Sequence, residues 1–217
     1  MLGEELSLRT GRWTAIRGPR AWVKRAIDLC AAAIALLLCA PLLAGTALLI
    51  ALDSRGPILY RQERAGRFGC PFKILKLRTM RVGAEEELEE LVDVEALQEP
   101  VFKLKDDPRV TRVGRFLRRW SIDELPQLVN VLRGEMSLVG PRPEETWIVA
   151  RYSRWHRQRL WARPGMTGPV QVSGRADLSL QERVQLEVKY IEGYRLWRDV
   201  AILLKTVPAV IRGEGAY

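Results

Sequence analysis

The longest apolar run of the chain lies near its beginning and predicts a membrane helix. Residues 29–52 contain no charged side chain, and a helix of this length can cross a bilayer. Pro41 lies near the middle of the run, where a proline removes a backbone hydrogen bond and favours a kink. We therefore expect a helix over residues 24–52 that bends at Pro41.

Basic residues flank this run on both sides, which leaves its topology open. They are Arg17, Arg20, Lys24 and Arg25 before the run, and Arg55, Arg61, Arg64 and Arg67 after it. Positive flanks prefer the cytoplasmic face of a membrane. A straight crossing would place one of them outside, whereas a helix that turns back at Pro41 keeps both inside. A spanning helix and a re-entrant helix both fit the pattern.

Downstream of this helix, the pattern predicts short strands and helices. A strand begins at residues 58–60, and residues 72–78 alternate apolar and basic side chains, which predicts a half-buried strand with one cationic face. That face could bind an anion or simply be solvated. Residues 84–99 are rich in glutamate and predict a solvated helix face. Helical spacing over residues 113–132 is interrupted at Pro126, which predicts a junction between two helices.

Two later segments combine aromatic residues with arginine or with apolar runs. The first, residues 147–161, contains Trp147, Tyr152, Trp155 and Trp161 among Arg151, Arg154, Arg157 and Arg159. This mixture suits a helix at a membrane interface, and nucleic-acid binding through stacking is the alternative. The upstream apolar run favours the interface. Residues 190–211 predict a second amphipathic element of the same kind, so the predicted fold class is α+β, mainly helical.

Composition narrows the class of partner. The chain has 217 residues and a formal net charge of +9, enough for one compact domain with an anchor and a charge that implies an anionic partner. That partner could be nucleic acid, anionic lipid or a phosphorylated substrate. The chain has 3 cysteines and 1 histidine, at no spacing that suggests a zinc site, a disulfide framework or a histidine-based triad.

The acidic pair Asp123-Glu124 carries the strongest chemical signal. It follows the arginine pair 118–119 and precedes Pro126. Arginine recognises phosphate oxygens, and a carboxylate beside it can hold a divalent cation or attack phosphorus. A helix junction also exposes backbone N–H groups that favour phosphate.

Two loops after this pair each hold one arginine among proline and glycine. They are residues 140–143, with Arg142, and residues 163–169, with Arg163. Proline fixes the backbone, and glycine permits close approach. Ordinary structural turns are the alternative for each loop alone.

These motifs together, in this order, closely resemble a known family. They occupy residues 24–28, 72–80, 107–111, 121–128, 130–143, 163–168 and 171–175. Their order is similar to that of the bacterial sugar transferases known as monotopic polyprenol-phosphate phosphoglycosyl transferases. The resemblance covers nearly everything from about residue 22 onward. The end of the chain, over residues 204–213, resembles the larger members, which initiate exopolysaccharide or O-antigen synthesis and carry additional N-terminal membrane helices. We expect this chain to be either a natural minimal form or a catalytic fragment.

The resemblance implies a reaction and a location. A UDP-sugar gives its phosphosugar to undecaprenyl phosphate with release of UMP, through a covalent aspartyl-phosphosugar and with Mg²⁺. This is the first membrane step of exopolysaccharide, capsule or O-antigen synthesis, at the cytoplasmic face of the bacterial inner membrane. By position, Asp123 is the nucleophile and a metal ligand, and Glu124 is its partner. The family's helix-break-helix element falls on residues 24–52 with its break at Pro41, which supports a re-entrant helix.

The same resemblance divides the chain and assigns its phosphate ligands. It implies a basic segment at 1–23, a re-entrant anchor at 24–56 and a small cytosolic catalytic domain at 57–217. The residues expected to bind donor or acceptor phosphate are Lys76, Arg78, Arg118, Arg142, Arg163, Gln171 and Arg175. Family members commonly have serine before the proline, whereas this chain has Ala40, so the bend angle is open. We expect no nucleic-acid partner; self-association through the interfacial helices fits equally well, and no residue specifies the sugar.

Overall fold

The computed structural model describes residues 16, 18–84, 107–174 and 178–213. Its helices and strands follow one another along the chain as α2 (Pro19–Asp53), β1 (Leu59–Ala65), η1 (Arg67–Gly69), β2 (Pro71–Leu77), α4 (Arg112–Arg119), η2 (Ile122–Glu124), α5 (Gln127–Arg133), β3 (Ser137–Val139), α6 (Thr146–Ala150), η3 (His156–Trp161), β4 (Gly165–Thr167), α7 (Leu180–Glu192) and α8 (Leu196–Arg212). The prediction of a mainly helical α+β fold is confirmed. Residues 85–106, which include nearly all of the glutamate-rich segment, and Arg175 lie outside the described residues.

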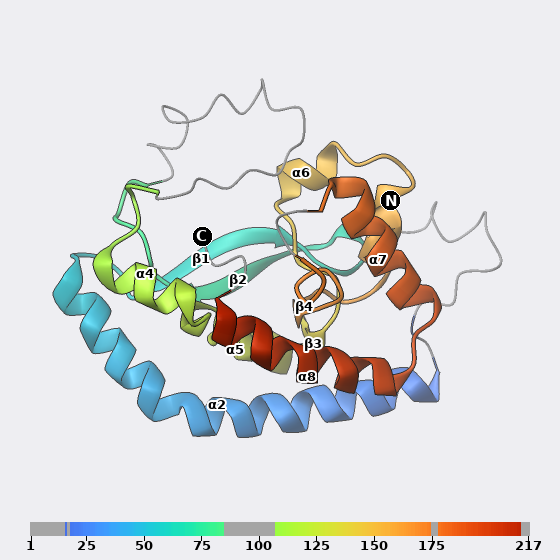
Figure 1. Ribbon diagram of the computed structural model, residues 1–217, viewed down its shortest axis with the longest axis horizontal. Coiled ribbons are helices and arrows are strands. Elements are labelled where there is room, and N and C mark those ends of the chain that lie inside the picture. The colour runs from blue at the N-terminus through green and yellow to red at the C-terminus, as the bar shows by residue number, and fades with distance from the viewer. Residues whose placement is uncertain (1–15, 17, 85–106, 175–177, 214–217) are drawn as a thin grey trace.

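The β1–β2 hairpin lies at the centre of the molecule, with helices around it (Figure 1). The strands pair antiparallel from Leu59 opposite Leu77 to Ala65 opposite Pro71. Phe72 and Ile74 pack against α5 and α2, whereas Leu77 packs with Leu117 and Ile50. The prediction of a strand at residues 72–78 is therefore confirmed.

The single cationic face predicted for this strand is wrong. Successive side chains of a strand point to opposite faces, so Lys73 and Lys76, three residues apart, lie on different faces. Lys73 is exposed and Lys76 is half-buried. Both faces of β2 also contribute residues to hydrophobic clusters, which leaves only individual basic side chains free for other contacts.

Asn130 of α5 completes the edge of β2 that β1 does not cover. Its Oδ1 accepts a hydrogen bond from the Leu75 N–H at 3.0 Å, and its Nδ2 donates to the Lys73 carbonyl at 2.8 Å. A side-chain amide thereby takes the place of a third strand, since buried backbone groups need partners. This contact fixes α5, and with it the turn that precedes α5, against the hairpin.

Helix α2 buries polar side chains and exposes apolar ones, the reverse of a helix on the surface of a soluble protein. The side chains that it buries against the protein include Lys24, Asp28 and Thr46, whereas Leu37 and Leu38 are 76% and 73% exposed. Among the described residues, α2 is the one helix long and apolar enough to cross a membrane by length and composition. Polar groups that face the protein and apolar groups that face outward are typical of a helix in lipid.

Both ends of α2 are attached to the rest of the protein. Near its start, Lys24 Nζ lies 2.6 Å from Asp199 Oδ2 of α8, and Ser137 Oγ donates to Asp28 Oδ2 at 2.7 Å. Near its end, Arg78 Nη2 donates to the Ser54 carbonyl at 2.6 Å. The helix therefore lies along one side of the molecule, next to α5 and α8 (Figure 1).

The helix bends without a break. Figure 1 shows a bend near the middle of α2, and Pro41 is the proline inside the helix. Helical assignment continues through it from Pro19 to Asp53, so the expected helix-break-helix is a single bent helix that begins before residue 24. Thr46 Oγ1 also donates to the Leu42 carbonyl at 2.9 Å, a side-chain contact that bends helices.

The segment at 147–161 is not the interfacial helix that its composition predicts. It forms two short helices, α6 and η3, separated by a turn, and α6 lies on the side of the molecule opposite α2 (Figure 1). Tyr152 and Arg159 are buried. The aromatic and basic side chains in this segment serve partly as core, which composition alone does not reveal.

The C-terminal stretch comes closer to its prediction. Its helix α8 lies beside α2 in Figure 1 and buries Asp199, Ile202 and Ala209. Its other face exposes large apolar side chains, namely Leu196, Trp197, Val200, Leu203, Leu204, Val207 and Ile211. An amphipathic helix is therefore confirmed here, joined to α2 by the Lys24–Asp199 ion pair.

Candidate active site

The acidic pair lies in a tight turn between α4 and α5. Helix α4 ends at Arg119, and Ser121 then takes a left-handed conformation with φ 54°. This region is sparsely populated by residues other than glycine, and such strain gathers at functional sites. Residues 122–124 form the single turn η2, and Pro126 is the N-cap of the next helix, α5. The predicted helix junction is confirmed.

Asp123 is buried without a side-chain hydrogen bond. It is 7% exposed, and among the described residues no side chain donates a hydrogen bond to its carboxylate. Burial raises the pKa of this carboxyl; the positive charge of Lys76 opposes the rise, and the negative charge of Glu124 adds to it. A hydrogen bond from its own backbone N–H lowers the pKa in part. Asp123 is therefore a desolvated carboxylate without a side-chain donor, an environment in which functional carboxylates are commonly found.

Glu124 joins the turn to two cationic residues that the sequence also singled out. Lys76 Nζ, from β2, lies 3.2 Å from Glu124 Oε1, and Arg142 Nη2, from the loop after β3, lies 3.5 Å from the same oxygen. The negative charge of Glu124 raises the pKa of Arg142. The Arg142 side chain remains 43% exposed, so a phosphate group could replace Glu124 as its partner.

Arg118 approaches the turn from the last turn of α4. Its Nε donates to Thr79 Oγ1 at 2.9 Å, which fixes the guanidinium on a buried side chain at the end of β2. Burial lowers the pKa of Arg118, and the charge of Asp123 opposes this effect. The structure thus brings together Asp123, Glu124, Lys76, Arg118 and Arg142 from three stretches of the sequence, namely β2, residues 118–124 and the loop after β3.

Arg78 does not join this group. Strand β2 ends at Leu77, and Arg78 turns away to donate to the carbonyl and Oγ of Ser54 beyond the end of α2. Arginine stabilises a helix C-terminus in this way, because the last carbonyls lack partners within the helix. Its Nε and Nη1 are buried without a hydrogen-bond partner in the described residues, so contact of Arg78 with phosphate remains a prediction.

The remaining predicted ligands lie elsewhere or outside the described residues. Arg163 is half-buried and lies close to Arg25, whose pKa is lowered by burial and by the charge of Arg163. Arg25 itself donates to the carbonyls of Val131 and Leu132 at the end of α5. Gln171 is buried beneath Gly168. Their contact with phosphate remains a prediction.

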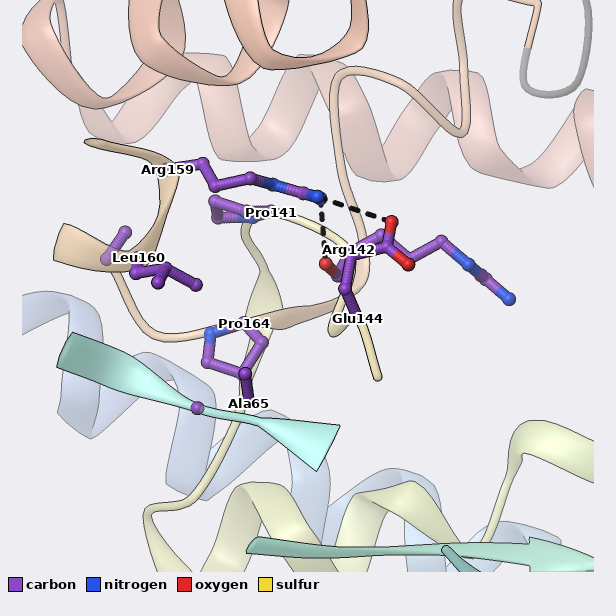
Figure 2. A pocket seen from close by; sticks show the side chains of 9 residues that line it. Ala65, Pro141, Arg142, Glu144, Arg159, Leu160 and Pro164 are labelled. Carbon is purple, nitrogen blue, oxygen red and sulfur yellow. Dashed lines mark hydrogen bonds and ion pairs between the residues drawn. The ribbon is translucent and has the colours of Figure 1, made fainter. Parts of the chain in front are cut away.

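A buried ionic network behind Arg142 was not predicted. Figure 2 shows Arg159 bonded to both Glu144 and Arg142, and Glu187 of α7 completes the network with a hydrogen bond from Arg159 Nη2 at 2.9 Å. Burial would raise the pKa of Glu144, but the guanidinium of Arg159 reverses this effect and holds the pKa below its usual value. A sequence signal existed for Glu187, because it shares the apolar stripe of α7 with Val184 and Val188.

The turn also fits a magnesium ion. Mg²⁺ is usually held by one or two carboxylates together with substrate phosphates, and Asp123 and Glu124 are adjacent. The carboxylate oxygens of Asp123 are suitable ligands. Among the described residues no group of 3 or more His, Cys, Asp or Glu side chains gathers, so a site built entirely from protein ligands is not present in that part of the chain.

Most of the chain is similar to known proteins. The family model described as bacterial sugar transferase matches residues 19–213. The chain is 45% identical over 200 residues to a UDP-galactose-lipid carrier transferase of Erwinia amylovora, which covers 90% of this chain and 42% of that protein. It is 47% identical over 202 residues to the UDP-glucose:undecaprenyl-phosphate glucose-1-phosphate transferase of Caulobacter vibrioides, covering 89% of this chain and 72% of that protein.

A third relative is of similar length. The exopolysaccharide production protein ExoY of Rhizobium meliloti is 42% identical over 207 residues, covering 94% of this chain and 92% of that protein. By contrast, the chain spans less than half the length of the Erwinia relative.

Proposed function

The chain belongs to the bacterial sugar transferase family, and from this premise we propose that it transfers a sugar phosphate from a UDP-sugar to undecaprenyl phosphate. The observation that carries the proposal is Asp123, a buried carboxylate with no side-chain hydrogen bond in the described part of the chain, beside Lys76, Arg118 and Arg142. The names of the relatives support the two substrates.

The reaction proceeds in two displacements at one phosphorus atom. In the first, an Asp123 carboxylate oxygen forms a bond to the β-phosphorus of the UDP-sugar, and the bond from this phosphorus to the bridging oxygen breaks. UMP leaves with that oxygen and its electron pair. In the second, a phosphate oxygen of undecaprenyl phosphate attacks the same phosphorus, and the bond to Asp123 breaks. The products are undecaprenyl-diphosphate-sugar and the regenerated carboxylate.

The chemistry of the carboxylate and the cationic residues around it both favour this two-step reaction. An acyl phosphate is a good phosphoryl donor, so a carboxylate suits a two-step transfer. Two steps also let a soluble donor and a lipid acceptor use one site in turn. The cationic groups of Lys76, Arg118 and Arg142 stabilise the negative charge that develops on the donor phosphates.

Asp123 and Glu124 are the residues that would hold Mg²⁺. When bound, the ion supplies further neutralisation of phosphate charge. The ion pairs of Glu124 with Lys76 and Arg142 place these cations at the edge of the same site.

The anchor supports a location at the cytoplasmic face of the inner membrane. At roughly 1.5 Å per residue, the 35 residues of α2 extend about 50 Å, yet both of its ends contact one globular body. A spanning helix would separate its ends across the bilayer. We infer a re-entrant helix whose exposed middle enters the lipid, with the apolar face of α8 on the same surface.

This topology has its own test. Single cysteines that replace the exposed Arg20 and Arg55 should both react with a membrane-impermeant thiol reagent from the cytoplasmic side, in a background without the native cysteines. Labelling of one of them from the periplasmic side would show that α2 spans the membrane.

The activity is tested with purified protein in detergent or lipid nanodiscs. Incubation with a panel of UDP-sugars, undecaprenyl phosphate and Mg²⁺ should release UMP with at least one sugar. Without the acceptor, intact-mass spectrometry should find the protein heavier by one phosphosugar. Asp123→Asn should abolish both signals, and Glu124→Gln should lower turnover severely.

The matched control is Arg112→Ala, at an exposed arginine of α4, which should remain active. If lipid-linked product accumulates while no adduct forms with any donor, the two-step reaction is wrong. If Asp123→Asn forms the adduct at the wild-type rate, Asp123 is not the nucleophile.

A further inference from the structure

The backbone of Arg142 is held on both sides by charged side chains from the interior. The Arg142 N–H donates to Glu187 Oε1 at 3.0 Å, and its carbonyl accepts from Arg159 Nη2 at 2.9 Å. Arg159 is 3% exposed and Glu187 is completely buried. A backbone segment gripped by a buried ion pair has little freedom to move, because each lost contact would leave a buried charge without its partner.

The network behind this pair also holds the neighbouring residues of the loop. Arg159 Nη1 lies 3.3 Å from Glu144 Oε1 and also donates to the Tyr152 hydroxyl. The Glu144 carbonyl accepts from the Ala65 N–H at 2.8 Å, which ties the loop to the end of β1. The loop is thus fixed to α7, η3 and the hairpin.

Within the described part of the chain, Arg142 is the residue of this loop whose side chain reaches the acidic turn. It is partly exposed and contacts Glu124, whereas Pro141 and Pro143 on either side are buried. Among the described residues, no hydrogen bond or ion pair joins Arg159 or Glu187 directly to residues 121–124. Their connection to the turn runs through Arg142.

We propose that Arg159 and Glu187 are positioning residues that hold the Arg142 guanidinium where it meets Glu124 and the donor phosphate. This role rests on the proposed function. A guanidinium that is already in place stabilises developing charge without reorganisation, and a small displacement of such a group lowers the rate steeply. Loss of the ion pair should therefore slow formation of the Asp123 adduct, even in molecules that remain folded.

The test is a double-mutant cycle on the rate of adduct formation in a single turnover. In the wild-type background, Arg159→Met should lower this rate about a hundredfold per folded molecule. In an Arg142→Ala background, the same change should alter the rate by no more than about twofold, because its effect is transmitted by Arg142. Thermal unfolding of each variant supplies the folded fraction.

Two further variants keep the test decisive. Glu187→Gln keeps an oxygen that can accept from the Arg142 N–H but removes the ion pair with Arg159, so it should lower the rate of adduct formation about tenfold. This variant replaces Arg159→Met in the test if Arg159→Met does not fold. Arg154→Met, at an exposed arginine close in sequence, should leave the rate unchanged.

The outcomes separate this inference from the proposed function. If Arg159→Met or Glu187→Gln lowers the rate of adduct formation by the same factor in the wild-type and Arg142→Ala backgrounds, the Arg159–Glu187 pair has only a structural role and the inference is wrong. It is also wrong if neither folded variant slows the adduct. If wild-type protein forms no adduct with any UDP-sugar, the proposed function fails first.

Discussion

Asp123 and Asp199 are buried to nearly the same extent, 7% and 6% exposed, yet their surroundings are opposite. Asp199, at the joint between α2 and α8, accepts from Lys24 Nζ at 2.6 Å and from the hydroxyls of Tyr190 and Tyr194 at 2.6 and 3.1 Å. Asp123, in the acidic turn, accepts from no side chain in the described residues. A carboxylate with its full set of donors stabilises the fold. One left open is available for chemistry and adds nothing to stability.

The largest expected effects come from removing the charge of Asp199 or of Asp123, and they differ in kind. Asp199→Asn should lower the free energy of unfolding by about 3 kcal/mol, because it removes the closer of the two counter-charges of buried Lys24 and leaves only Asp28 at 3.9 Å. Asp123→Asn should instead lower turnover by more than about a thousandfold and leave the fold intact. Chemical denaturation and UMP release measure the two effects.

Two results would contradict this predicted contrast between Asp199→Asn and Asp123→Asn. If Asp199→Asn unfolds no more easily than wild type, or if Asp123→Asn is the less stable of the two, saturation with hydrogen bonds does not separate structural from functional carboxylates here.

A smaller effect concerns the arginines near the acidic turn. Arg118 is fixed by Thr79 and senses the charge of Asp123, whereas Arg112, on the same helix, is exposed. Arg118→Ala should lower kcat/KM for the donor about tenfold to a hundredfold, a range expected for loss of one charged contact in the transition state. Arg112→Ala should change it little. Equal losses would show that the overall positive charge, and not the place of Arg118, promotes the reaction.

The smallest effect is a shift in pH dependence. Burial raises the pKa of Asp123, and the carboxyl must be ionised to attack phosphorus. The acid limb of the rate of adduct formation should therefore lie above the ordinary aspartate value of about 3.9. An acid limb at or below that value would contradict the raised pKa.

The same shift affects stability with a definite sign. Between the unfolded and the folded pKa, the native state binds more protons than the unfolded state, so ionisation of Asp123 makes the free energy of unfolding fall as pH rises. Asp123→Asn should remove this dependence, and its stability relative to wild type should increase across that pH range. Denaturation at several pH values measures the difference.

Local patterns predicted much of the fold. The long apolar run, the strand at residues 72–78 and the helix junction at Pro126 each follow from periodicity or proline chemistry within one segment. Asp123, Glu124, Lys76, Arg118 and Arg142 were also named from the sequence, although only the fold shows that they converge. The direct pattern and the family resemblance pointed to the same turn.

The errors arose where tertiary contacts decide the role of a side chain. The single cationic face predicted for residues 72–78 is wrong, because Lys73 and Lys76 lie on different faces of the strand. Arg159 and Tyr152 have the composition of an interface, but a partner on α7, Glu187, draws Arg159 into the core. No local pattern indicates a partner 28 residues away.

The tie between Lys24 and Asp199 has a consequence for how the protein is made. These residues lie 175 positions apart, so α2 is synthesised long before Asp199. At about 5–20 residues per second, the ribosome needs roughly ten seconds or more to supply that partner. During this interval Asp28, 3.9 Å from Lys24 on the same helix, is the partner that the lysine has, and Asp199 of α8 later supplies the closer contact. The contact between the two ends of this sequence therefore forms last among the attachments of α2, after those made with residues 78, 131, 132 and 137.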